Sequence, residues 1–430
     1  MKYSAEIFDK FQFLYKETGY CDRQVRCVVS FNGNADPETL KKAAELLLST
    51  VPILSRKYVN LGNKSYWEDT NFQNVENVFT VTYSKTAFDS FSCSMTDAEN
   101  GPQIKFCLLC AENNMLVVVI NHMVSDAAGL KQCMYLYAEI YSNLIRDPDY
   151  LPNFVIDGDR GFKNIVCPVS FPHRLISLLF VSKDSNQKSL CGFPMGNSGK
   201  VEPFVMQHEI SPKVFWDMKE YCHVRGITVN DVVLTAYLRA LSKMLGMQGQ
   251  EIAVPIMIDM RRYLKDKNFN ALTNLSSTSI VKRCIPESED FESSLAGVNA
   301  IMNAKKENGL GLNTFFKLYA GFRIPFIDAY KIMRKALKNP PISMTNIGVI
   351  DSAKLVFENT EVRNAVMFAS IKYRPYFQIS VSSFNDRMTL GTGLYGDEED
   401  RANIIKLFEL MDGELQAMEA CRAAKAGYHI

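Results

Sequence analysis

One stretch, Met115 to Leu130 (MLVVVINHMVSDAAGL), constrains the fold of this chain more than any other. Its first six residues are all apolar, a run that is too short to span a membrane but has the length of a buried β-strand. Asn121 and His122 follow at the carboxyl end of that strand. From Leu130 onward apolar residues recur at helical spacing, after a polar turn. The sequence therefore predicts a strand, a turn and a helix, with an imidazole held at the end of the strand.

An imidazole at the end of a buried strand can be held rigidly while one of its edges faces a cavity, which suits a general base. The structural alternative for His122 is a packed or surface histidine. Asp126 follows four residues later, in a turn that also contains Gly129. His and Asp are both metal ligands, but a zinc site needs at least a third protein ligand. No second His or Cys stands nearby at a familiar interval, because Cys133 falls inside the expected helix, so we expect no metal here.

Size and composition limit the class of protein. The 430 residues exceed one typical domain and fit two lobes of about 200 residues each. A net charge of +1 gives no reason to expect a nucleic-acid partner. Eleven cysteines without paired spacing favour reduced thiols, as in the cytoplasm. No apolar run approaches eighteen residues, and the N-terminus lacks the apolar region of a secretory signal. We expect a cytoplasmic protein with no membrane span.

Turn and capping residues divide the chain into strands and helices. Asp36 and Pro37 predict the start of a helix, and Thr228 followed by Asp231 has the pattern of a capping box. Pro255 inside an apolar stretch predicts an edge or bulged strand, and Pro325 predicts a break in a long helical segment. The main predicted elements are a helix over 37–50, a hairpin of 104–110 and 115–121, a helix over 229–245, extended segments over 252–260 and 275–281, a helical segment over 291–338, a hairpin of 380–384 and 388–395, and a helix over 399–420.

The domain organisation follows from these elements. Residues 147–200 are rich in Pro, Gly, Asn and Ser and show little periodicity, which indicates a crossover between lobes. We therefore expect an N-terminal lobe over 1–175 and a C-terminal lobe over 176–430 that includes the crossover. Each half mixes strands and helices and has its own sheet, so the predicted fold class is α+β.

The stretch around His122 resembles the HxxxD motif of the CoA-dependent acyltransferase superfamily. This superfamily includes chloramphenicol acetyltransferase, alcohol acetyltransferases, plant acyltransferases and the condensation domains of peptide synthetases. Other segments resemble the family in the matching order, and the likeness is greatest to stand-alone members of the alcohol acetyltransferase type. These segments are PILSRKY (52–58), ITVNDVVLTAYLRAL (227–241), VPIMIDMRRYL (254–264), MTNIGVID (344–351) and ISVSSFNDRMTLGTGLY (379–395). The resemblance implies two similar mixed α/β lobes, a chloramphenicol acetyltransferase-like pseudo-dimer, with an active-site tunnel between them.

The resemblance also implies a reaction. His122 would act as the general base that deprotonates a hydroxyl or amine acceptor as it attacks an acyl-CoA. Acyl-CoA would be a co-substrate, with no tightly bound cofactor and no covalent acyl-enzyme. Asp126 would be structural, pointing away from His122 and pairing with an arginine. Arg261 in IDMRRY matches that arginine, and because side chains alternate along a strand, only one of Arg261 and Arg262 can face the first lobe. Solvated surface arginines are the alternative.

Other residues are candidates through the same resemblance. Asn121 and Gly129 would support the motif from either side. Thr345 and Asn346 lie in a second-lobe motif near the tunnel and could donate to a developing oxyanion, although they also read as turn residues at a strand end. Ser382 could line the tunnel, but the same spacing describes a half-exposed strand.

Two departures from the family pattern bear on function. Condensation domains usually carry a second His where this chain has Asn121, which makes condensation on carrier-protein-bound thioesters the less favoured alternative. The family usually has Gly after the Asp, where this chain has Ala127, so the turn must avoid a positive φ there. A catalytically silent relative that binds a ligand in the same cleft is the alternative outside enzymes.

Overall fold

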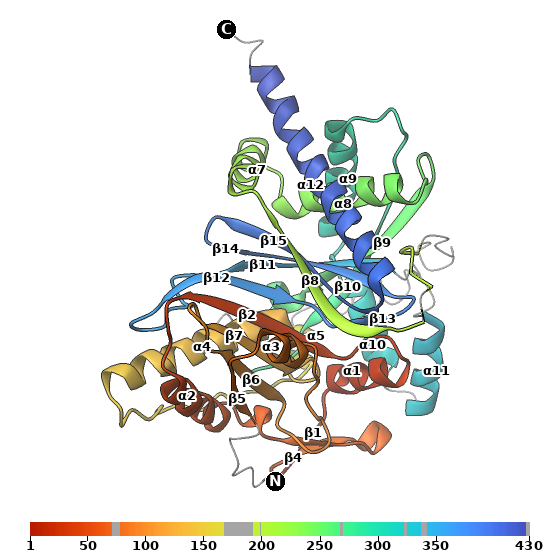
Figure 1. The fold of residues 1–430 in the computed structure, drawn as a ribbon. Helices are drawn as coiled ribbons and strands as arrows, with labels where there is room; N and C mark the ends of the chain where they lie inside the picture. The colour runs from red at the N-terminus through yellow and green to blue at the C-terminus, as the bar shows by residue number, and fades with distance from the viewer. Residues whose placement is uncertain are drawn as a thin grey trace.

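The computed structural model describes residues 1–70, 78–166, 192–197, 199–266, 270–321, 325–336 and 342–426. In these residues two large β-sheets lie one above the other, each with helices on its outer side, and a small third sheet lies near the N-terminus (Figure 1). The N-terminal part of the chain supplies most of the lower sheet, and residues after 200 build the upper one. The molecule thus consists of two mixed α/β lobes, and the predicted α+β class is confirmed.

The lower sheet contains the strand predicted at the start of the stretch Met115 to Leu130. Its strand order is β12 (Glu361–Phe368), β2 (Gln24–Asn32), β7 (Met115–Asn121), β6 (Ile104–Leu109) and β5 (Phe79–Thr82). Helices α2 (Pro37–Thr50) and α4 (Ala127–Arg146) cover one face, and α3 (Lys85–Ser92) packs on the other. Because both faces of β7 are covered, its side chains form a continuous apolar run rather than an alternating one.

The upper sheet is built entirely from strands that follow residue 200. Its strand order is β10 (Ser276–Cys284), β9 (Glu251–Asp259), β11 (Ile342–Ile350), β14 (Phe377–Phe384), β15 (Arg387–Gly396) and β13 (Lys372–Tyr373), and β8 (Glu202–Ile210) also pairs with β15. Four helices bury their apolar sides against its outer face: α7 (Pro212–Arg225), α8 (Val229–Met244), α9 (Phe291–Glu307) and α12 (Glu398–Ala426).

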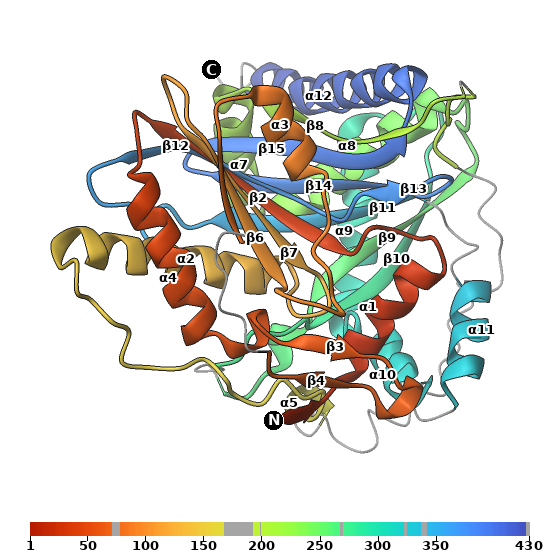
Figure 2. The ribbon, with the colours of Figure 1, turned by 60° about the horizontal axis from the view of Figure 1, so that its bottom comes forward.

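The remaining elements lie beside the two sheets. The small sheet has the order β1 (Lys2–Ser4), β4 (Tyr66–Glu68), β3 (Lys57–Val59), and α1 (Ile7–Glu17) follows β1. Three helices complete the described structure: α5 (Lys163–Val166), α10 (Leu312–Gly321) and α11 (Phe326–Ala336). Figure 2 shows α1, α10 and α11 gathered near the same edge of the molecule.

The two large sheets approach each other where β12 lies against β14 and β15. The hydroxyl of Ser382 accepts a hydrogen bond from the Met367 amide at 3.2 Å, and Ser380 donates to the Met367 carbonyl at 3.4 Å. A Cβ placed on Gly391 would lie 2.9 Å from the ring of Phe368. Small side chains on β14 and β15 therefore allow a strand of the lower sheet to pack closely on the upper one.

Most predicted elements are present. Asp36 caps α2 by accepting from the Thr39 amide at 2.7 Å, and Thr228 and Asp231 form the expected capping box at α8. Both predicted hairpins form, the second turning at Asn385, which has a φ of 49°. Local signals are sufficient at these places because the cap or turn is made by residues within three or four positions of each other.

Three expectations need correction. The helix after the HxxxD stretch begins at Ala127 and not at Leu130, because Asp126 caps it. Strand β9 is not an edge strand, since it lies between β10 and β11 despite Pro255, although a single residue pair joins it to β11. The helical segment over 291–338 is broken near 308–311 as well as at Pro325. Much of the predicted crossover, including the lobe boundary at 175/176, lies outside the described residues.

Among the described residues, every helix is too short or too polar to cross a membrane.

Candidate functional site

The candidate site begins where β7 ends. The ladder between β2 and β7 continues one residue beyond the strand, since the His122 amide donates to the Arg23 carbonyl at 2.8 Å. The chain then turns over Met123 to Ser125 and enters α4, which Asp126 caps by accepting from the Gly129 amide at 2.9 Å. His122 is therefore fixed between a buried strand and a capped helix, a rigid base for a functional side chain.

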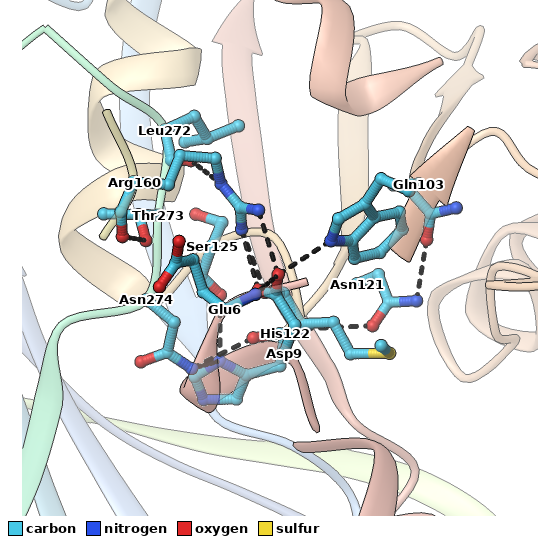
Figure 3. Close-up of polar contacts among 12 residues, drawn as sticks. Glu6, Asp9, Gln103, Asn121, His122, Ser125, Arg160, Leu272, Thr273 and Asn274 are labelled. Carbon is cyan, nitrogen blue, oxygen red and sulfur yellow. Dashed lines mark hydrogen bonds and ion pairs between the residues drawn. The ribbon is translucent and has the colours of Figure 1, made fainter. Parts of the chain in front are cut away.

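Hydrogen bonds determine which ring nitrogen of His122 carries the proton. Nδ1 lies 2.8 Å from the carbonyl oxygen of Ser125 (Figure 3). A carbonyl can only accept, so Nδ1 is the N–H of the neutral ring and Nε2 keeps its lone pair. The Asn274 amide nitrogen also lies 3.1 Å from Nδ1, but it donates to the His122 carbonyl at 3.0 Å, and two N–H groups cannot hydrogen-bond to each other. The unprotonated nitrogen is the one on the edge of the ring opposite Nδ1.

Burial keeps the imidazole neutral. The ring is largely surrounded by protein and is partly open to a pocket. Burial lowers the pKa of His122 below its usual value, and the Lys372 ammonium adds to this effect. The Asp126 carboxylate and the hydrogen bond to Ser125 act in the opposite direction without overcoming burial. At neutral pH His122 is therefore an uncharged base.

Asp126 points away from the imidazole and into an ion pair. Its Oδ2 lies 2.7 Å from Nη1 of Arg261 and accepts from the Leu275 amide, also at 2.7 Å. Both side chains are largely buried, with exposed fractions of 7% for Asp126 and 14% for Arg261. Burial alone would raise the pKa of Asp126, but the charge and hydrogen bond of Arg261 and the two backbone N–H groups lower it. The predicted pair of Asp126 with Arg261 is present.

Arg261 also makes hydrogen bonds within the second lobe. It donates to the Thr273 carbonyl at 2.9 Å and to Oδ1 of Asp259 at 3.2 Å. It lies in a single 3-10 turn, Met260–Tyr263, immediately after β9. Asp126 and Arg261 thus join the start of α4 in the first lobe to the end of β9 and to the segment that leads into β10 in the second.

A second largely buried arginine, Arg160, which was not predicted from the sequence, also contacts the turn after His122 (Figure 3). Arg160 forms a two-fold ion pair with Asp9, at 2.9 and 3.1 Å, and donates to the carbonyls of Leu272 and Met123 at 2.7 and 3.3 Å. The Trp67 indole donates to the same Asp9 carboxylate at 2.7 Å. These residues are far apart in the sequence, and no local pattern connects them.

A pocket between the lobes brings several of the predicted residues together. His122, Asp126, Thr345 and Asn346 all line it. The Asn346 amide donates to Asn230 at 3.3 Å and its oxygen accepts from the Gly348 amide at 2.9 Å, across a bulge in β11. Thr345 is the half-buried hydroxyl beside it. The same pocket is lined by residues that the sequence analysis did not propose: Gln12, Tyr20, Lys131, Ser276, Thr278 and Lys372.

The other predicted residues lie outside the pocket lining. Asn121 is fully buried, donating to Gln103 at 2.8 Å and accepting from the Met123 amide at 3.1 Å, so it holds the turn. Gly129 permits close packing, because a Cβ there would lie 2.5 Å from the Ser125 hydroxyl. Ser382 does not line the tunnel as predicted: it is buried between the sheets on Met367. The alternation of side chains along a strand predicts which face of β14 carries Ser382. It cannot show that a strand of the other sheet covers that face.

Within the described part of the chain, no group of three or more His, Cys, Asp or Glu side chains is arranged to hold a metal ion.

Comparison with known proteins shows the fold. No protein-family model matches the sequence, and no curated protein matches it. Solved structures do match over nearly their whole length. The TRI3 trichothecene 15-O-acetyltransferase from Fusarium sporotrichioides has a TM-score of 0.70 at 12% identity, covering 96% of this chain and 95% of that one. The chain has the fold of the condensation-domain and acyltransferase superfamily.

Two further structures with this acyltransferase-like fold are condensation domains. The first condensation domain of the CDA synthetase has a TM-score of 0.69 at 10% identity, covering 96% of this chain and 97% of that one. A variant of the starter condensation domain of rhizomide synthetase RzmA in complex with C8-CoA has a TM-score of 0.67 at 11% identity, covering 97% and 95%. At such low identity the likeness establishes the two-lobed architecture, and the activity has to be argued from the residues of the pocket.

Proposed function

We propose that this chain is an acyltransferase that moves an acyl group from acyl-CoA to a hydroxyl or amine acceptor, with His122 as the general base. The observation that carries this proposal is the tautomer of His122. Nδ1 donates to the Ser125 carbonyl, so the basic Nε2 is left on the opposite edge of a ring that lines the pocket. The shared fold with an acetyltransferase and with a condensation domain that binds C8-CoA supports the same reaction class.

The proposed step is direct. Nε2 of His122 takes the proton as the acceptor oxygen or nitrogen attacks the thioester carbonyl. The tetrahedral intermediate then collapses, the C–S bond breaks, and the CoA thiolate leaves with the proton returned by the imidazolium. A donor aimed at the oxyanion would lower the barrier, and the hydroxyl of Thr345, which lines the same pocket as His122, is the candidate.

The proposed role of Asp126 and Arg261 is structural. Both oxygens of the carboxylate are engaged by Arg261, the Leu275 amide and the Gly129 amide, so Asp126 has no hydrogen bond to the imidazole. It holds the turn that carries His122 and joins the lobes, which we propose to extend over 1–175 and 176–430.

Product formation, followed by mass spectrometry, tests the proposal. Wild type, His122→Ala and His223→Ala would each be given acyl-CoAs of several lengths with pooled alcohols and amines. His223 is the matched control, because it is an exposed histidine near the end of α7. We expect a mass-shifted acceptor with wild type and His223→Ala, and a loss of about 100-fold or more in His122→Ala.

Other outcomes decide among the alternatives. Equal product from His122→Ala would remove His122 from the role of base. The same assay is repeated with the acyl group carried on a phosphopantetheinyl carrier protein in place of CoA. Product formed only from the carrier protein would indicate a condensation-type enzyme. Binding of CoA, seen as a rise in unfolding temperature, without any product would indicate an acceptor missing from the pools. Neither product nor CoA binding would favour a carrier-protein enzyme or a silent relative.

A further inference from the structure

A buried lysine in the same pocket has no acidic partner. Lys372 is only 4% exposed, lies in the short strand β13 and lines the pocket together with His122. No hydrogen bond or ion pair forms at its ammonium group among the described residues, and its Nζ lies 3.9 Å from the centre of the Tyr20 ring. An aromatic face offsets only part of the cost of removing an ammonium from water.

The carboxylates around Lys372 are already bound to other cations. Asp126 and Asp259, which line the pocket, both contact Arg261. Asp22, next to the residue that pairs with Lys372, is fully buried in an ion pair with Arg26 and also accepts from the Ile371 amide. Because each of these three acids pairs with an arginine, no carboxylate balances the positive charge of Lys372 among the described residues.

The backbone around Lys372 holds it rigidly. Lys372 pairs with Leu394 of β15 on one side and forms a bridge to Cys21 on the other. The Asp22 amide donates to the Ile371 carbonyl at 3.0 Å, and the Tyr373 amide donates to the Tyr20 carbonyl at 3.3 Å. The side chain of Lys372 is buried from bulk solvent and lines the pocket, so the pocket is where a ligand can balance its charge.

We propose that Lys372 binds a carboxylate carried by the substrate, so that the pocket selects an anionic acceptor or an anionic acyl group. The proposal rests on the proposed acyl transfer and adds the class of substrate. The ammonium is close enough to act on the imidazole electrostatically, since it contributes to the lowered pKa of His122. A substrate carboxylate on Lys372 would thus lie in the same cavity as the reacting group.

Paired probes in which a neutral group replaces the carboxylate test this inference. In the acceptor arm, lactate, 4-hydroxybutyrate and 4-hydroxyphenylacetate are each compared with the corresponding amide. In the donor arm, malonyl-CoA is compared with propionyl-CoA and succinyl-CoA with butyryl-CoA. Binding to the full chain is measured by calorimetry. In at least one arm we expect the charged member to bind wild type about tenfold or more tightly than its neutral partner.

Three variants separate ligand binding from a structural role. Lys372→Met should lose the preference for charge while remaining at least as heat-stable as wild type without ligand, because it removes an uncompensated buried charge. Lys372→Arg should keep part of the preference. Lys354→Met is the matched control, since that lysine is 65% exposed on the loop after β11, and it should behave as wild type.

The outcomes are distinct from those of the acyl-transfer test. No preference for the charged member in either arm, or a preference that persists in Lys372→Met, overturns the inference. His122→Ala should retain the preference while losing turnover. A charge preference in a protein that forms no acylated product would leave Lys372 as the anion site and reject the proposed reaction.

Discussion

The His122 imidazole has one nitrogen committed to the protein and one left for chemistry. The Ser125 carbonyl requires a proton on Nδ1, and burial favours the neutral ring. A general base needs both conditions, because a charged or wrongly protonated ring has no lone pair at the reacting edge. The hydrogen bond to Ser125 and the burial of the ring together explain its orientation and its availability as a base.

At the residue scale, the pH dependence of turnover follows from this environment. We expect kcat/KM to be constant at neutral pH and to fall in acid, with an apparent pKa below about 6.5, the usual value for histidine. The sign is set by burial, which lowers the pKa of His122. The same shift makes the neutral ring a stabilising feature of the folded state above about pH 6.5, and this contribution is lost as the pH falls through the lowered pKa. Initial rates between pH 4.5 and 8 measure the profile.

Substituting Lys372 should shift that pH profile in a known direction. Its positive charge is one cause of the lowered pKa of His122, so Lys372→Met should move the acidic limb toward higher pH. An apparent pKa above 6.5 for the fall of kcat/KM in acid in wild type would contradict the assignment of His122 as base. A flat profile while chemistry is rate-limiting would contradict it as well.

At the scale of secondary structure, the start of α4 organises the site. Asp126 is at once the N-cap of α4, the partner of Arg261 and the acceptor for the Leu275 amide of the second lobe. The sequence predicted the helix but placed its start three residues late, because Ala127, Ala128 and Gly129 read as a turn. Ala127 is accommodated because it is the first helical residue and needs no positive φ.

Asp126→Asn should therefore reduce stability as well as turnover. The substitution removes the buried carboxylate from Arg261 and leaves that arginine only Asp259, whose side chain is 52% exposed. Breaking a buried ion pair costs about 3–5 kcal/mol of the free energy of unfolding. Urea denaturation measures this loss. Asp89→Asn is the control, because its pair with Lys85 on α3 is more than half exposed and should matter little. An Asp126→Asn protein of wild-type stability with a purely catalytic defect would argue against the structural role.

At the scale of the whole molecule, contacts between neighbouring residues could be predicted from local patterns in the sequence, and contacts between distant residues could not. Caps, hairpins and the buried strand β7 could be predicted because the residues that form them are neighbours in the chain. The Arg261 pair was found only through a family motif, since it joins positions 135 residues apart. Asn274, Arg160 and Lys372 carry no local pattern, because each acquires its role from a segment that folds beside it. Ser382 was misplaced for the same reason.

The contact between the two large sheets gives a last prediction, because it depends on glycine at one position. A Cβ on Gly391 would lie 2.9 Å from both the Phe368 ring and the Ser380 hydroxyl, so Gly391→Ala forces β12 away from β15. Such overpacking costs about 1–3 kcal/mol of the free energy of unfolding. Gly413→Ala is the matched control: nothing lies within 4 Å of that Cβ, and alanine in the middle of α12 should add up to about 1 kcal/mol of stability. Calorimetry should therefore show the unfolding temperature falling for the first variant and rising for the second. If both substitutions raise it, the lobes do not depend on this close approach.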